Sequence, residues 1–314
     1  QARPYLADLM EQISDASQVL RRGLEEPEVL AEAREMLVEI IHQLDPKKHG
    51  IADQIREASV LLLLRPLLVD LLCASGMSEE DARALLDKTG ADGLGGDLFI
   101  DGSLGSHTAW LLEPYADQPD STGNAYLDVD AIAAHIRACT LAGVQAGFHA
   151  IGDGAVSSAA AAFRRVADEL GGPKVAALGH RLEHAEMMSM ADAETFAALG
   201  VIASVQPVFD ALWGGTDGLY ATRLGVERAA ALNPFAPAAG KGVSLAFSSD
   251  APVTPIEPWA MLRAAVQHRT DGSGISPRAA FSAATRGAWR AGGSAIWPAA
   301  AGFSASPVAA LAAP

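Results

Sequence analysis

The chain has little cysteine and little positive charge, and each shortage excludes a class of protein. Only Cys73 and Cys139 occur among 314 residues, so we expect no disulfide framework and a reducing compartment. Lysine and arginine together number 23, against 38 aspartates and glutamates, which gives a net charge of −15. No basic stripe is present to neutralise phosphate groups, and this excludes nucleic acid as a partner.

Long hydrophobic runs are also absent. The longest apolar stretch, from Leu61 to Leu72, is interrupted by Arg65 and Asp70 and is too short to cross a bilayer. The first residues do not show the basic region and apolar stretch of a secretory signal. We therefore expect a cytoplasmic protein with no membrane partner. Half of its residues are hydrophobic, which is enough for a sizeable core.

Residues 1–88 predict helices only. Apolar residues at helical spacing between Leu9 and Leu44 predict an antiparallel helical hairpin. A third helix is expected from Ile51 to Leu72, kinked or divided at Pro66. Ser78 with Asp81 resembles a capping box for a short helix ending near Leu86. We find no strand and no catalytic residue in this segment.

From Gly90 onward, short apolar strands alternate with helices, which is the pattern of an α/β fold. The expected strands are Gly96–Ile100, Val144–His149, Ala177–His184, Val201–Gln206 and Ser244–Ser249. The expected helices are Val129–Ala142, Ala155–Leu170, Met190–Leu199, Pro258–Gln267 and Pro277–Ala288, the last with Ser276 as its N-cap. Strands joined by helical crossovers imply a parallel sheet. Residues 291–314 are rich in alanine, glycine and proline, and we expect a tail of low order.

Three of these strands end in a residue that can bind a metal. His149, His184 and Asp250 each follow an apolar run, and in (β/α)₈ barrels catalytic groups lie at this end of the strands. A single histidine there is more often a satisfied core residue, but three such strand ends indicate a site. Asp153, which follows His149, either caps the next helix or lies behind the histidine.

Five motifs carry a resemblance to a known family. They read D-G-S-L-G-S-H-T-A at 101–109, F-H-A-I-G-D at 148–153, H-R-L-E-H-A at 180–185, S-V-Q-P at 204–207 and F-S-S-D-A-P-V at 247–253. In order and spacing the chain resembles the metal-dependent amidohydrolases over residues 89–290. It is most similar to the family 3 branch, which includes N-substituted formamide deformylases.

The resemblance implies a (β/α)₈ barrel with a metal site at the carboxyl ends of its strands. His149 matches the family's ligand on the fifth strand, His184 the ligand on the sixth, and Asp250 the aspartate of the eighth. In the family that aspartate also handles the proton of the attacking water, so Asp250 is the expected catalytic residue. Two imidazoles and a carboxylate suit zinc, which activates water at neutral pH.

The chain also departs from the family pattern. It contains no H-x-H pair, and Asp97 stands where most of the branch has a lysine. Asp97 can ligate a metal, but its short side chain cannot easily bridge two ions, so we expect one ion at most. The fold class is therefore α/β, as a partial or degenerate barrel over residues 89–290 that follows the helical segment. The apolar run 61–72 is expected to cover the open side of the sheet, or else the protein self-associates there as a homo-oligomer.

Four further residues are candidates for a substrate pocket. Ser103 and His107 lie in the glycine-rich loop, and Gln206 and Asp210 lie at or beyond the end of a strand. A glycine-rich turn of this kind also needs no function.

Strand alternation makes predictions for the residues around His184. Because neighbouring strand residues point to opposite faces, Glu183 and Arg181 should face away from the pocket of His184, and His180 should share its face. Trp213 and Tyr220 are either pocket walls or a local packing cluster.

Two functions follow from these observations. The first is a metal-dependent hydrolase that cleaves carbon–nitrogen bonds in small non-peptide amides with metal-activated water. The second is a non-catalytic remnant of the family with a role in assembly. Ancestry favours the first function, whereas the missing H-x-H pair favours the second.

Overall fold

The computed structural model describes residues 78–89 and 93–292, and within them the chain forms one parallel sheet. Its order, β1-β2-β3-β4-β5, is also the order along the chain. The strands are β1 (Gly93–Phe99), β2 (Gln145–Ala150), β3 (Arg181–His184), β4 (Ile202–Val205) and β5 (Ser244–Phe247). The predicted α/β class with a parallel sheet is confirmed.

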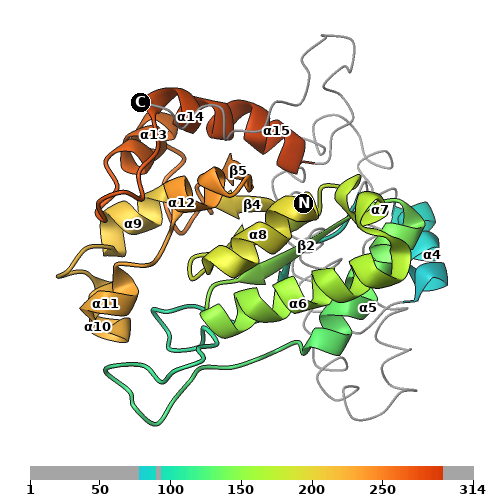
Figure 1. Ribbon diagram of the computed structural model, residues 1–314, viewed down its shortest axis with the longest axis horizontal. Coiled ribbons are helices and arrows are strands. Elements are labelled where there is room, and N and C mark those ends of the chain that lie inside the picture. The colour runs from blue at the N-terminus through green and yellow to red at the C-terminus, as the bar shows by residue number, and fades with distance from the viewer. Residues whose placement is uncertain (1–77, 90–92, 293–314) are drawn as a thin grey trace, which may run out of the picture.

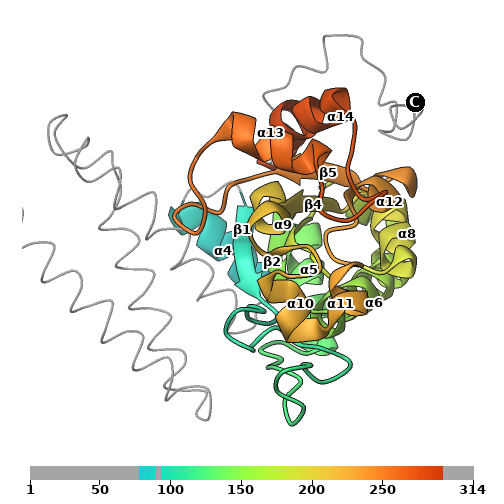
Figure 2. The ribbon, with the colours of Figure 1, turned by 90° about the vertical axis from the view of Figure 1, so that its left-hand side faces the viewer.

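Helices connect the strands and flank the sheet (Figure 1). Before and between the strands lie α4 (Glu79–Thr89), α5 (Val129–Ala142), α6 (Asp153–Leu170), α7 (Gly172–Ala176) and α8 (Met190–Ala198). Between β4 and β5 lie α9 (Pro207–Trp213), α10 (Leu219–Leu224), α11 (Val226–Ala229) and α12 (Phe235–Gly240). After β5 follow α13 (Pro258–Val266), α14 (Pro277–Ser282), the π-helical turn η2 (Ala283–Gly287) and α15 (Ala288–Ala291). Figure 2 shows α4 beside β1, and α13 and α14 beyond β5.

The two faces of the sheet differ in chemistry. One face carries buried apolar side chains, among them Leu98, Phe148 and Leu182, which form one core with apolar residues of α5, α6, α8 and α12. This burial follows from the period-two alternation of the strands. The other face carries polar residues and is only partly covered, where Ala291 of α15 packs on Ile202 and Ala246. The apolar face holds the fold together and leaves the polar face for chemistry.

Local sequence signals set several helix boundaries as predicted. α5 spans the predicted residues; Asp128 accepts a hydrogen bond from the Ala131 amide at 2.8 Å, and Gly143 ends the helix with a left-handed φ of 78°. α4 begins with the predicted capping box, since Ser78 and Asp81 each accept from the other's backbone amide. Side-chain oxygens at these positions satisfy amides that a helix start leaves unpaired.

Other predicted boundaries were wrong. Residues 177–180 were expected to open a strand, but β3 begins only at Arg181 because the short helix α7 precedes it. Pro173 starts that helix, and Gly179 turns the chain with a φ of 57°. The sequence analysis also missed α9 to α12, whose four to seven residues are too few to show a helical period.

Several predictions fall outside the described residues. They are the hairpin of residues 1–44, the helix and apolar run ending at Leu72, and the tail beyond Gly292. The boundary at residue 88 stays a prediction. The part of the chain before it that the structure describes, α4, packs on α5, where Arg83 donates to the Leu141 carbonyl at 2.7 Å. None of the described helices is long and apolar enough to cross a membrane.

A bulge in β1 shapes the polar face. Leu94 pairs with Ala146 and Leu98 with Phe148, so four steps along β1 oppose two steps along β2. Gly95 adopts a φ of 73° within this bulge. Opposite the bulge lies Gly147 of β2, and a Cβ atom on it would stand 2.8 Å from the Gly95 carbonyl oxygen. The close approach requires glycine at position 147.

We predict that Gly147→Ala destabilises the protein by about 1–3 kcal/mol, because the added methyl group must push the bulge away from β2. Urea unfolding of the full chain measures the change. Gly240→Ala is the matched control, since Gly240 has no atom within 4 Å of an added Cβ. Equal stabilities of the two variants would contradict the close packing of the bulge.

Candidate metal centre

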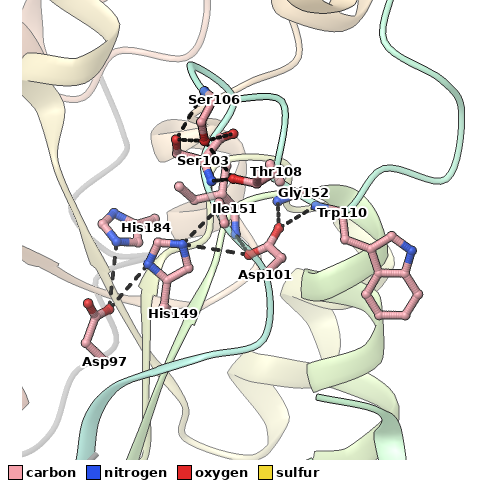
Figure 3. Close-up of polar contacts among 12 residues, drawn as sticks. Asp97, Asp101, Ser103, Ser106, Thr108, Trp110, His149, Ile151, Gly152 and His184 are labelled. Carbon is pink, nitrogen blue, oxygen red and sulfur yellow. Dashed lines mark hydrogen bonds and ion pairs between the residues drawn. The ribbon is translucent and has the colours of Figure 1, made fainter. Parts of the chain in front are cut away.

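Three side chains that can bind a metal converge on the polar face, at the carboxyl ends of β1, β2 and β3. They are Asp97, His149 and His184, and one ligand atom of each lies within 4.8 Å of the other two. Asp97 Oδ1 is 3.5 Å from His149 Nδ1 and 3.8 Å from His184 Nε2. Figure 3 shows the three side chains pointing toward one another. The predicted ligands Asp97, His149 and His184 are thus brought together.

In each imidazole, the ring nitrogen that faces away from Asp97 makes a hydrogen bond, and this bond determines which nitrogen faces the cluster. His149 Nε2 is 3.1 Å from the Gly102 carbonyl oxygen, which can only accept, so Nε2 carries the proton. His184 Nδ1 is 2.8 Å from Gln206 Oε1. The Gln206 amide is itself oriented, since its Nε2 donates to Ser248 Oγ at 2.9 Å. In their neutral forms, His149 and His184 therefore direct the lone pairs of Nδ1 and Nε2 at Asp97.

The protonation states suit a cation. Burial, and next the neighbouring His149, lower the pKa of His184 to about 3, so its imidazole is neutral. Burial alone would raise the pKa of Asp97, but the imidazoles of His149 and His184 beside it hold that pKa below its usual value. Burial alone would lower the pKa of His149, but the Asp97 carboxylate beside it raises that pKa. A cation bound between Asp97 and His149 Nδ1 would take the place of the proton that this pairing favours.

Two atoms of the cluster have no hydrogen-bond partner. Within the described part of the chain, Asp97 Oδ1 and His149 Nδ1 are buried and unpaired. Such groups are costly to bury unless something satisfies them. In tetrahedral coordination, ligand bonds of about 2.0–2.1 Å place ligand atoms about 3.4 Å apart, close to the 3.5 and 3.8 Å observed. The donor set and its spacing fit one divalent cation.

A cavity of about 410 Å³ adjoins the cluster. Its polar lining comes from β1, β3, β4 and β5 and the residues that follow β4 and β5: Asp97, Arg181, Glu183, His184, Ser204, Gln206, Ser248 and Asp250. Ala288 and Ala291 of α15 and Gly292, which follows that helix, also line it. The cavity is large enough for a small molecule.

Asp250 lies in this cavity but outside the cluster of three. It follows β5, has a left-handed φ of 52° and lines the same cavity as Asp97 and His184. Burial and the charge of Asp97 raise its pKa above the usual value. The structure therefore places it beside the ligands, and its assignment as a fourth ligand or as a proton carrier stays a prediction.

The alternation argument around His184 was wrong. Glu183 and Arg181 were expected to face away, yet both line the cavity with His184. The reason is the backbone of His184, whose φ of 69° is left-handed and ends the regular pleat. Arg181 Nε donates to Glu183 Oε1 at 2.8 Å. His180 faces the helices instead, where its Nε2 lies 3.1 Å from Thr140 Oγ1 of α5.

The four candidate pocket residues have different surroundings. Gln206 lines the cavity and holds His184, as described above. Ser103 and His107 do not line this cavity. The Oγ atoms of Ser103 and Ser106 are hydrogen-bonded at 2.8 Å, and His107 Nε2 lies 3.0 Å from Asp117 Oδ1. Asp210 is buried and accepts from the Arg269 amide at 2.8 Å. The carboxylate of Asp210 is thus already engaged by the backbone near the end of α13.

Two open alternatives also gain structural detail. Asp153 accepts from the Leu112 amide at 2.9 Å, so it fastens a loop to the start of α6. The ring of Trp213 packs against the rings of Phe209 and Tyr220, at centroid distances of 4.7 and 6.2 Å. The aromatic side chains at 213 and 220 thus belong to a local packing cluster.

The sequence analysis missed one important residue, Asp101. It is fully buried, and its carboxylate accepts from the backbone amides of Trp110, Ile151 and Gly152 at 2.8–3.0 Å. Burial raises the pKa of Asp101 to about 6 against the effect of these bonds. The available signal was its place as the first letter of the D-G-S-L-G-S-H motif, one residue beyond a predicted strand.

The chain is similar in sequence to two curated proteins. Over 170 residues the chain is 36% identical to "Protein LONG AFTER FAR-RED 3" of Arabidopsis thaliana, a match that covers 54% of this chain and 28% of that protein. Over 177 residues it is 30% identical to "Putative amidohydrolase YtcJ" of Bacillus subtilis (strain 168), covering 55% of this chain and 31% of that one. The chain thus spans less than a third of the length of these relatives.

Solved structures show the same fold. An uncharacterized metal-dependent hydrolase from Pyrococcus furiosus matches with a TM-score of 0.56 and 29% identity, over 68% of this chain and 45% of that one. A second uncharacterized metal-dependent hydrolase, from Pyrococcus horikoshii OT3, matches with a TM-score of 0.56 and 23% identity, over 84% of this chain and 59% of that one. The model of the amidohydrolase family matches residues 77–295, more than half of the chain. The chain therefore belongs to the amidohydrolase family, in its family 3 branch.

Proposed function

We propose that this chain is a metal-dependent hydrolase that cleaves carbon–nitrogen bonds in small non-peptide amides. The observation that carries the proposal is the convergence of Asp97, His149 and His184, with ligand atoms within 4.8 Å of one another. Membership of the amidohydrolase family supports the reaction class. The alternative, a non-catalytic remnant with a role in assembly, predicts no use for two buried unpaired ligand atoms.

One divalent cation, which we take to be zinc, is the proposed cofactor. Two imidazoles and one carboxylate form a three-ligand set, which in catalytic zinc sites leaves a fourth position for water or substrate. A cation bound there would lower the pKa of water and polarise the substrate carbonyl. The carboxylate of Asp97 is shorter than the lysine usual in the family, which supports one ion rather than two.

Asp250 is the proposed catalytic residue. It lines the cavity beside the ligands, and its carboxylate can accept a proton from the attacking water. Water adds to the amide carbonyl, the carbon–nitrogen bond breaks, and the proton held by Asp250 passes to the leaving nitrogen. The products are a carboxylic acid, which is formate for a formamide, and an amine.

The remaining cavity residues suit a small polar substrate. Arg181, Ser204 and Ser248 offer donors, and Ala288 and Ala291 offer an apolar wall. A volume of about 410 Å³ is at the small end of ligand sites. The cavity therefore favours a compact substrate such as an N-formyl amine.

We further propose that the sheet is the second half of a (β/α)₈ barrel. Its strands run parallel in chain order without reversal, whereas doubly wound sheets reverse their order at a switch point. Strand ends that share one mouth are the usual place of catalytic groups in such barrels. In this assignment, residues 89–290 form the barrel portion, 1–88 a separate helical segment, and 291–314 a tail.

We predict that the full chain, purified without chelator and supplied with zinc, binds one ion per molecule. His149→Gln and His184→Gln should lose that ion, because each removes one of three ligands. His135→Gln is the matched control, since His135 is also a buried histidine bonded to a backbone carbonyl but lies on α5. Elemental analysis after gel filtration measures the stoichiometry. Absence of zinc from the wild-type chain would favour the non-catalytic alternative.

We predict that Asp250→Asn keeps the ion but hydrolyses N-formyl amines about 10²–10⁴-fold more slowly, because it can no longer carry a proton. Release of the amine, followed with a fluorogenic reagent, measures the rate. Asp217→Asn is the control, as the Asp217 side chain is 88% exposed. A wild-type rate for Asp250→Asn would remove Asp250 from the reaction.

A further inference from the structure

The D-G-S-L-G-S-H loop is tied to the strand that carries His149 through one buried carboxylate. Asp101 Oδ1 accepts from the Ile151 amide at 3.0 Å, and its Oδ2 accepts from the amides of Gly152 and Trp110, each at 2.8 Å. Ile151 and Gly152 form the turn just after β2. The carboxylate therefore joins the loop that begins at residue 101 to the end of the strand that holds the ligand (Figure 3).

The same loop also contacts the ring nitrogen of His149 that faces away from Asp97. The Gly102 carbonyl oxygen lies 3.1 Å from His149 Nε2, and Asp101 Oδ1 lies 3.8 Å from that nitrogen. The carbonyl cannot turn away freely, because the Ser103 amide of the same peptide group donates to Thr108 Oγ1 at 3.0 Å. A Cβ atom at Gly102 would stand 2.0 Å from Thr108 Oγ1, so the loop is closed tightly on itself.

This arrangement selects one tautomer of His149. A carbonyl oxygen accepts from an N–H but repels a lone pair, so it favours the form with hydrogen on Nε2. In that form the lone pair of Nδ1 faces Asp97, whose Oδ1 is 3.5 Å away. Groups behind a metal-binding histidine fix its ring and its tautomer in this way.

We propose that Asp101 is a positioning residue for the metal centre: by fixing the Gly102 carbonyl against His149, it sets the tautomer and the ring orientation that present Nδ1 to the cation. The inference rests on the proposed function, since it concerns the same three ligands. Asp101 itself touches neither cation nor substrate and acts through His149.

Asp101→Asn tests this role with little change in shape. An amide has a single acceptor oxygen, so at least one of the three backbone N–H groups must face an NH₂ group instead. The loop then loosens behind His149. We expect the dissociation constant for cobalt(II), measured on the full chain by its visible absorption, to rise about 10- to 100-fold.

Two control variants separate positioning from general stability. Tyr115→Phe removes a buried hydrogen bond to the Ala109 carbonyl in the same loop. Asp192→Asn repeats the aspartate-to-asparagine substitution at the start of α8, where the Asp192 carboxylate accepts from Ser189 Oγ at 2.6 Å. Both should lower the melting temperature while keeping the cobalt affinity of the wild type. An equal loss of affinity in Tyr115→Phe would show that any loosening of the loop suffices, and would overturn the special role of Asp101.

The outcomes also separate the two proposals. If the wild-type chain binds no cobalt, the proposed function fails. If the wild-type chain binds cobalt and a folded Asp101→Asn variant binds it equally well, the positioning role fails while the proposed function stands.

A second measurement needs no folded variant of Asp101. In the metal-free wild-type chain, the ¹⁵N shifts of His149 report its tautomer at about pH 9, where an imidazole is neutral; His149→Gln assigns the signal. We expect hydrogen on Nε2. Hydrogen on Nδ1 would show that the loop does not set the tautomer, and would overturn the inference.

Discussion

The parallel pairing of β1, β2 and β3 is the constraint on which the rest of this structure depends. The carboxyl ends of parallel strands lie on the same side of the sheet. Phe99 therefore pairs with His149, and Ala150 with His184, at the carboxyl ends of these strands. Asp97 and His149, which are 52 positions apart in the chain, and His149 and His184, which are 35 apart, thereby become neighbours. An antiparallel arrangement would have sent alternate strand ends to opposite borders, and the three ligand-type side chains would not have met.

The apolar face supplies the free energy that keeps these strands in register. Its side chains are buried against α5, α6, α8 and α12 in one continuous core, at roughly 25 cal/mol for each Å² of apolar surface removed from water. A shift of one residue would move the apolar set to the other face. The same core therefore determines both the stability of the sheet and the positions of Asp97 and His149 on its polar face.

The polar face is costly to form and depends on pairing. Arg181 donates to Glu183 and to the Ala291 carbonyl, at 2.8 Å in each case. Its guanidinium group therefore connects β3 to the end of α15. Burial raises the pKa of Glu183, while Arg181 opposes that rise. Removal of one partner from such a pair leaves a charge without compensation. The floor of the cavity is thus held by charge pairing, in contrast to the apolar opposite face.

Backbone strain at the strand ends completes the site. His184, Ala185 and Asp250 all have a φ near 50–70° although none is glycine. Residues of this kind cost free energy and persist only where their surroundings hold them. At His184 the left-handed backbone turns the imidazole toward Asp97, into the cavity that Glu183 also lines.

The sequence by itself determined the α/β class, the parallel sheet, the span of α5 and the capping of α4, because apolar periodicity and capping residues act over a few neighbouring positions. Its motifs also determined the family. Tertiary structure decided the tautomers of His149 and His184, the turning of His184 into the cavity that Glu183 lines, and the burial of Asp101. Each of these depends on a partner distant in the chain, such as Gly102 for His149 or Gln206 for His184. No local pattern encodes such contacts, since they exist only once the strands have paired.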